Sequence, residues 1–370
     1  MSAARMGHGR RSFALAIVRA RASALASAMA SAIAIASSAM MIGCSSPPAT
    51  ALVATPWNPS GQSSESPAAA GAVALHPAIP FTVEESAGGL VYRTPSYIIH
   101  TTLPDTRLRA LLPTFQELAL EHYRTAIVGL PAPTGLMTSY VFGKRDEWVR
   151  HAEADLGEAA ATFKRLGRGG YTRHGVSVLY DIGYFDTLTI AAHEGWHQYA
   201  QSTFGGTLPP WLDEGMATYC EGCVGIRGRG QPEFVPWRNL ERFSALRDVV
   251  NSNAIRPLEA VIVGSPQGFL LEGRDALLDY YAQVWTLVHF LAEYDHGRFR
   301  PALQRMLLDA ASGRLRPAAG PHGLRRQFEE YFGTNPSQLD SAYRAFIGVI
   351  TSPGASNAVY RGESPYTSTR

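Results

Sequence analysis

Residues 193–197 read His-Glu-Gly-Trp-His and combine two imidazoles with a carboxylate. On a helix, residues four apart differ by about 40° around the axis, so the rings of His193 and His197 project from one face. That spacing suits two ligands of a tetrahedral zinc ion, and Glu194 is placed to reach a water on the metal. The motif therefore predicts a zinc-binding helix that needs a third ligand.

The segment after this helix offers that third ligand. Glycines at 205–206 predict the end of the helix, and prolines at 209–210 predict a turn before a second helix begins around Asp213. A catalytic zinc takes three protein ligands and keeps one position open. Glu214, 17 residues after His197, would face both imidazoles if the two helices pack antiparallel.

Residues 211–217 read W-L-D-E-G-M-A. H-E-x-x-H followed by W-L-x-E-G-x-A resembles the gluzincin clan of zinc metallopeptidases, which includes the membrane alanyl aminopeptidases and many uncharacterised bacterial peptidase-MA-like proteins. In that clan the Glu of the E-G pair is a ligand, so the resemblance implies one Zn²⁺ per chain, held by His193, His197 and Glu214. The element order matches over about 90–350, and the letters match mainly over 188–221 and 280–291.

The resemblance is nearest to the uncharacterised bacterial proteins. The aminopeptidases carry a G-x-M-E-N stretch before the zinc helix, and it is absent here. The resemblance therefore does not imply the specificity of an aminopeptidase. The chemistry expected is that of a peptidase, in which zinc lowers the pKa of its water to about 7. Glu194 would take the proton as general base and deliver it to the leaving amine.

Residues 280–291 resemble the tyrosine-bearing helix of the same clan. There a Tyr about 65 residues after the Glu ligand donates to the oxyanion that forms during hydrolysis. Tyr281, 67 residues after Glu214, is the first choice, and Tyr280 is the second. Gln283 and His289 on the same segment could also face the site, although the apolar neighbours of His289 favour a buried structural role.

Each ligand imidazole needs a partner on its other ring nitrogen. Glu221 follows Glu214 by seven residues and so returns to nearly the same helix face. It resembles a carboxylate at that place in the clan. Asp213 is the competing candidate, and it is also well placed to cap the start of its helix.

The sequence also indicates where a substrate would lie. Zincins bind the substrate backbone along an edge strand beside the zinc helix, and residues 175–181 (GVSVLYD) are expected to be that strand. Tyr171 and His174, just before it, could line the cleft. Trp196, inside the motif, is expected in the core.

The elements predict an α+β, zincin-like domain over 89–351, with a small mixed sheet and helices first and a helical C-terminal half. Hydrophobic residues make up 46% of the 370, which is enough for a sizeable core. A net charge of +2 without a basic run excludes a nucleic-acid partner. The expected strands lie at 90–92, 97–101, 136–142 and 175–181. The expected helices around the motif lie at 105–129, 147–166, 235–250, 275–296, 298–312, 322–333 and 336–350.

The N-terminal 44 residues predict an export signal, with Arg10 and Arg11 before an uncharged apolar stretch at 23–43. It ends in M-I-G-C-S-S, which resembles a bacterial lipobox with Met41 where Leu is usual. Lipid on Cys44 would anchor the protein in the cell envelope, and simple secretion or an uncleaved anchor is the alternative.

Low-complexity segments flank the predicted domain. Residues 45–88 are rich in Pro, Ser and Ala and predict a disordered tether, and residues 352–370 predict a disordered tail. The C-x-x-C pair Cys220 and Cys223 predicts a short disulfide or two buried thiols. Half of a metal site is disfavoured because no second C-x-x-C completes it.

The sequence therefore predicts an exported zinc metallopeptidase acting on a peptide or protein. A zinc hydrolase of another amide or an ester has the same ligand set and is the competing enzyme hypothesis. A non-catalytic envelope protein that retains the fold is the alternative of another class. The intact Glu194 argues against it, because a scaffold needs no general base.

Overall fold

The computed structural model describes residues 79–86, 88–161, 169–224 and 232–366. The predicted export signal with Cys44, and the tether up to residue 78, lie outside these ranges. The chain divides into two compact units, Met1–Gly71 with Leu156–Ala161, and Ala72–Asp155 with Thr162–Arg370. Of the first unit the structure describes only 156–161, which hold the 3-10 turn η1 (Gly157–Ala159). Everything below concerns the second unit.

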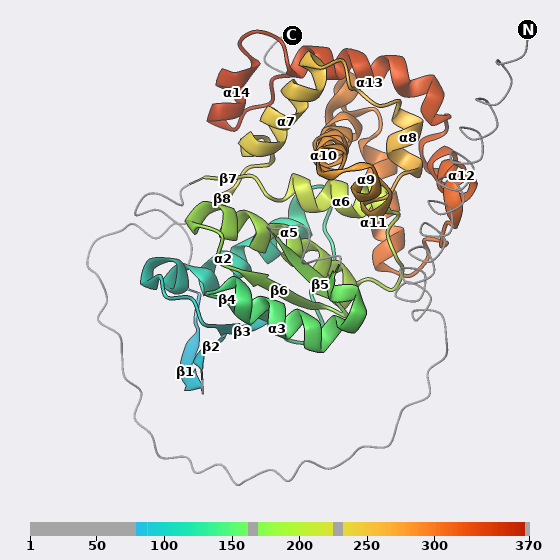
Figure 1. The fold of residues 1–370 in the computed structure, drawn as a ribbon. Helices are drawn as coiled ribbons and strands as arrows, with labels where there is room; N and C mark the ends of the chain where they lie inside the picture. The colour runs from blue at the N-terminus through green and yellow to red at the C-terminus, as the bar shows by residue number, and fades with distance from the viewer. Residues whose placement is uncertain (1–78, 87, 162–168, 225–231, 367–370) are drawn as a thin grey trace, which may run out of the picture. The chain divides into compact units, whose positions relative to one another are not determined.

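Six strands form one mixed sheet in the order β1-β2-β3-β4-β6-β5 (Figure 1). Strands β3, β4 and β6 run parallel, whereas β1 with β2, β2 with β3, and β5 with β6 are antiparallel. The strands are β1 (Thr82–Ser86), β2 (Gly89–Arg93), β3 (Tyr97–Thr101), β4 (Met137–Phe142), β5 (Gly170–Arg173) and β6 (Val176–Tyr180).

The strand predicted at the sheet edge is not the edge strand. Residues 175–181 form β6, which lies between β4 and β5, so β5 takes the edge position. The chain reverses between β5 and β6 through His174 and Gly175, whose φ values of 50° and 73° are both positive. Two such residues between paired strands make the tight hairpin that matches strand twist. This turn adds a strand that the hydrophobic pattern did not predict.

Helices cover both faces of the sheet. Alternate residues of a strand point to opposite faces. In β4, Ser139 donates a hydrogen bond to Gln198 of α5 (Tyr184–Thr203), while the ring of Tyr140 contacts His151 of α3 (Arg145–Leu156). α2 (Thr106–Thr125) packs on α5 and β3. α5, which carries the H-E-x-x-H motif, is therefore held between the sheet and other helices.

The C-terminal half is helical and is organised around α10 (Arg274–Gly297), whose residues from 282 to 292 are all buried. A helix that is buried all round sits in the core. The predicted α+β class, with a sheet first and helices later, is confirmed. The other elements are α6 (Pro210–Tyr219), β7 (Cys223–Val224), β8 (Glu233–Phe234), η2 (Pro236–Arg238), α7 (Leu240–Asn251), α8 (Leu258–Val263), α9 (Pro266–Glu272), α11 (Arg300–Ala311), α12 (Gly320–Phe332), α13 (Pro336–Ile350) and α14 (Ala355–Arg361).

Described elements extend beyond both predicted limits of the domain, residues 89 and 351. Within residues 45–88, which the sequence predicts to be a tether, β1 pairs with β2. All five residues of β1 are exposed, so it has no alternation of apolar and polar residues from which a strand could be predicted. Inside the predicted tail of 352–370, α14 buries Val359, and the ring of Tyr366 packs against Phe346 at 4.8 Å between centroids. These few apolar side chains anchor the tail through residue 366. Within the described ranges no helix is long and apolar enough to cross a bilayer.

The close packing of α2 on α5 depends on the glycine inside the motif. A Cβ on Gly195 would clash with the hydroxyl of Tyr123, which donates a 2.7 Å hydrogen bond to the carbonyl of Ala192. We expect Gly195→Ala to lower the free energy of unfolding by about 1–3 kcal/mol, because it overpacks this contact. Urea unfolding followed by circular dichroism measures the change.

The matched control is Gly348→Ala in α13, where an added Cβ meets nothing within 4 Å. That change should stabilise the protein by up to about 1 kcal/mol, because alanine has the higher helix propensity. Equal effects at the two glycines would contradict the packing argument.

Candidate metal centre

Three ligand atoms from two helices converge on one point. The Nε2 atoms of His193 and His197 lie 3.3 Å apart, and Oε2 of Glu214 lies 3.3 Å from the first and 3.5 Å from the second. In a tetrahedron with metal–ligand bonds of about 2.0–2.2 Å, the corners are about 3.3–3.6 Å apart. The three atoms therefore have the spacing of three corners of such a site. They form the one group of three or more candidate ligands among the residues described.

A positive charge would stabilise this cluster of two imidazoles and a carboxylate. Oε2 of Glu214 is buried and has no hydrogen-bond donor in the described part of the chain. Burial lowers the pKa of His193, but the carboxylates of Glu214 and Glu221 outweigh it and raise that pKa to about 9. Burial raises the pKa of Glu214, and the two imidazoles hold it far below its ordinary value. A bound cation would meet the same demand, so the residues fit a metal ion.

The ligands are supplied by local helix geometry and by one close helix contact. α5 places His193 and His197 one turn apart, and α6 places Glu214 against them. α6 packs on α10, where a Cβ on Gly215 would lie 2.8 Å from a methyl group of Val288. The glycine of the E-G pair thus lets α6 approach α10 closely enough for the site to form.

Each imidazole has its own acidic partner, so both competing candidates are used. Nδ1 of His193 lies 2.8 Å from Glu221, and Nδ1 of His197 lies 3.2 Å from Asp213. A carboxylate at Nδ1 favours the tautomer that directs the Nε2 lone pair at the metal position. Asp213 is not the helix cap that the sequence also allowed, because α6 begins at Pro210. Trp196 is buried as expected, and its indole N–H also donates to Asp213 at 3.0 Å.

Two residues behind Glu221 were missed by sequence reasoning. Asn239 caps the start of α7 and donates to Oε2 of Glu221 at 2.7 Å, and Arg242 binds both carboxylate oxygens at 2.9 Å. Burial raises the pKa of Glu221, but Arg242 and His193 lower it to about 2. Asn before a helix signals a cap, but nothing local links α7 to a residue 18 to 21 positions earlier.

Glu194 is held by the edge strand. The hydroxyl of Thr172 in β5 lies 2.8 Å from Oε2 of Glu194 and 3.0 Å from its backbone carbonyl. Gly170 permits this approach, because a Cβ there would lie 3.0 Å from Cγ of Glu194. Burial raises the pKa of Glu194, although the two histidines oppose the shift. A carboxylate with a raised pKa is a better proton acceptor near neutral pH.

The two adjacent tyrosines of α10 have different surroundings. The ring of Tyr281 lies edge to face with that of His193, at 5.8 Å between centroids. The ring of Tyr280 is fully buried and stacks on Phe269 of α9 at 4.5 Å. Burial raises the pKa of Tyr281 well above its usual value, so the phenol stays protonated and can donate.

Two other polar side chains of α10 are structural, as the sequence favoured for His289 and left open for Gln283. The side-chain amide of Gln283 accepts a 3.1 Å hydrogen bond from the backbone N–H of Arg256 and donates a 3.2 Å bond to its carbonyl. His289 is fully buried, stacks on Trp237 at 3.7 Å and bonds Glu293 at 3.0 Å.

The candidates before β6 and the C-x-x-C pair also lie outside the cluster. Tyr171 is buried against Trp148, and His174 is exposed in the hairpin turn. Cys220 and Cys223 are both free thiols. This agrees with the predicted thiols and not with the short disulfide.

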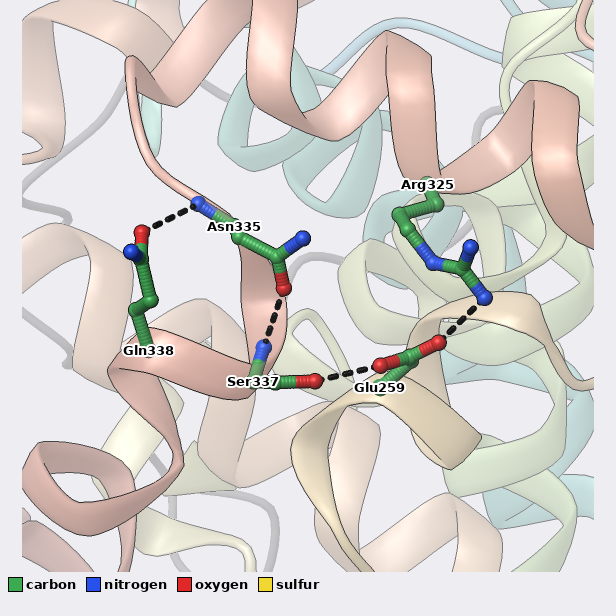
Figure 2. Close-up of a pocket in the computed structure, with 5 residues that line it drawn as sticks. All are labelled: Glu259, Arg325, Asn335, Ser337 and Gln338. Carbon is green, nitrogen blue, oxygen red and sulfur yellow. Dashed lines mark hydrogen bonds and ion pairs between the residues drawn. The ribbon is translucent and has the colours of Figure 1, made fainter.

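A pocket elsewhere in the helical half shows no comparable convergence. It is lined by Glu259, Arg325, Asn335, Ser337 and Gln338 (Figure 2). Every dashed contact in Figure 2 joins two of these lining residues, including the capping box of Asn335 and Gln338 at the start of α13. Glu259 accepts a hydrogen bond from Ser337 and pairs with Arg325, so these contacts join α8, α13 and α12.

Comparison with known proteins adds a partial match. A family model described as a protein of unknown function (DUF1570) matches residues 187–308. This range contains both imidazoles, Glu214, Glu221, Arg242 and Tyr281, and it omits the six-stranded sheet. No curated protein matches the chain.

Metal content tests the cluster directly. We expect purified protein to retain one zinc ion per chain after dialysis, and His193→Ala to lose it, because two remaining ligands hold zinc weakly. Elemental analysis by plasma mass spectrometry measures the ratio. His322→Ala, at an exposed histidine of α12, should keep the metal. A wild-type protein without metal, or a metal-loaded His193→Ala variant, would refute the assignment.

Proposed function

We propose that this protein is a zinc-dependent peptidase of the gluzincin type, which hydrolyses peptide bonds in a peptide or protein substrate. The observation that carries the proposal is the triangle of His193 Nε2, His197 Nε2 and Glu214 Oε2, with edges of 3.3 to 3.5 Å, beside the buried carboxylate of Glu194. Two imidazoles and one carboxylate make a donor set typical of catalytic zinc.

The chain's own groups support a proton-transfer cycle. When bound, zinc would act as a Lewis acid and lower the pKa of water in the site. Glu194 would accept the proton from the attacking water and pass it to the leaving amine. Thr172 orients that carboxylate, because its hydroxyl lies 2.8 Å from Oε2. A base held by packing and a hydrogen bond needs little reorganisation during the reaction.

Tyr281 is the proposed oxyanion donor. Its ring lies beside His193, and its raised pKa keeps the O–H available for donation. The neighbouring Tyr280 is excluded from this role by its packing against Phe269.

The substrate backbone is proposed to pair with β5, in place of the β6 segment expected from the sequence. β5 ends the strand order of the sheet, and its Thr172 contacts Glu194. A chain that adds to this edge would pass directly beside the base. The ligand set alone also suits hydrolysis of other amides or esters. We also propose that the protein is exported and anchored through Cys44. The predicted export signal and Cys44 lie outside the described residues.

The decisive experiment replaces the base without removing the metal. We expect Glu194→Gln to bind zinc normally and to lose hydrolysis of a fluorogenic casein by about 10²–10⁴-fold, because an amide cannot accept the proton. Glu121→Gln, at an exposed position of α2, is the matched control and should be fully active.

Retained casein hydrolysis in Glu194→Gln would disprove the mechanism. An inactive wild type with bound zinc would disprove the peptidase assignment. Hydrolysis of an ester panel by that same protein would then support the other hydrolase class.

The two tyrosines allow a paired test of the oxyanion donor. Tyr281→Phe should lower kcat by about 10²–10³-fold with little change in KM, because the donor acts mainly on developing charge. Tyr280→Phe removes a buried hydroxyl that has no hydrogen bond among the described residues, so activity should be unchanged. The opposite ranking in steady-state kinetics would assign the role to Tyr280.

A further inference from the structure

The support of His193 extends one residue beyond its acidic partner. Nε of Arg242 donates to Oε2 of Glu221 and Nη2 donates to Oε1, both at 2.9 Å. This is the two-pronged geometry that fixes a carboxylate in plane as well as in position. Asn239 adds a third donor at 2.7 Å to Oε2. Glu221 therefore has no freedom to rotate away from His193.

The two imidazoles are supported unequally. The Glu221 side chain is 1% exposed and Arg242 is 10% exposed, whereas the Asp213 side chain behind His197 is 31% exposed. Asp213 receives the neutral indole N–H of Trp196 and no cation among the hydrogen bonds and ion pairs of the described chain. A buried carboxylate without a paired cation is costly. The buried carboxylate of Glu221 thus depends on Arg242 for its stability, whereas the more exposed carboxylate of Asp213 can be solvated.

A second contact keeps the guanidinium in place. The ring of Tyr281 lies over it, with 5.3 Å from the guanidinium carbon to the ring centroid. That distance is within the range of a cation–π interaction. Arg242 is therefore held on one side by the carboxylate and on another by an aromatic face, which a flexible lysine would not reproduce.

We propose that Arg242 is a positioning residue of the metal centre, which sets the orientation of His193 by clamping Glu221. Arg242 lies on α7 and touches none of the three ligand atoms. It acts through Glu221, and its effect is on metal affinity and ligand geometry. The inference rests on the metal site of the proposed function, but it does not depend on which bond the site cleaves.

The test measures zinc affinity by competition with a chromogenic chelator. We expect Arg242→Met to bind zinc about 10–100-fold more weakly, the range observed when the partner of a ligand histidine is lost. Arg242→Lys should fall between this variant and wild type, because an ammonium cannot bind both oxygens in plane. Visible spectra of the cobalt-loaded proteins should differ from wild type in both variants, since ligand orientation sets their bands.

Arg344→Lys is the matched control. Arg344 also pairs with a carboxylate, that of Asp340 at 2.6 Å, but on α13 and away from the cluster. Its zinc affinity and cobalt spectrum should equal those of wild type. If Arg344→Lys and Arg242→Lys lost the same amount of zinc affinity, the cause would be general destabilisation of the fold, and the proposal would be overturned.

A paired variant protects the test from misfolding. Removing one partner of a buried ion pair destabilises a fold strongly, whereas removing both is often tolerated. Glu221→Gln combined with Arg242→Met should bind zinc as weakly as Glu221→Gln alone, because Arg242 acts through Glu221. Additive losses would overturn the proposal.

The outcomes separate this inference from the peptidase assignment. Weaker zinc binding in the Arg242 variants of a protein that hydrolyses no peptide would uphold the positioning role and refute the peptidase. Wild-type affinity and cobalt spectra in both Arg242 variants would refute the positioning role and leave the peptidase standing.

Discussion

Three lone-pair donors must be held within about 3.5 Å of one another for this centre to exist, and most of the surrounding structure follows from that constraint. Neutral imidazoles whose Nε2 lone pairs face each other and a carboxylate would repel at such distances, so the cluster needs a proton or a metal ion between these atoms. Close packing brings them together. Gly195 lets α2 approach α5, and Gly215 lets α6 approach α10.

The charges around the cluster form two arms of different character. Glu221 and Arg242 make a buried arm behind His193, while Asp213 makes a more exposed arm behind His197. The buried arm is rigid because Glu221 has fixed partners on both carboxylate oxygens, and it connects the candidate metal centre to α7. Tyr281 contacts both the guanidinium and the ring of His193, so the proposed oxyanion donor shares the same support.

The sheet contacts the candidate site through its edge strand. β5 brings Thr172 to the carboxylate of Glu194, so the strand beside α5 both orients this carboxylate and lies at the end of the sheet. The sequence predicted a strand near this place but assigned it to the β6 segment. The short hairpin through His174 and Gly175 carries no apolar alternation, and this is why hydrophobic periodicity did not predict β5.

The sequence by itself determined the parts of the site that lie within single helices. His193, Glu194 and His197 are related by helix geometry, and Glu214 could be predicted because one turn and one helix start separate it from them. The α+β class also followed from local patterns. Tertiary structure alone decided which carboxylate supports which imidazole, which tyrosine faces the cluster, and that Thr172 and Arg242 take part. These contacts join elements that are distant along the chain, and no local period encodes them, because they arise only when separate helices and strands pack into one core.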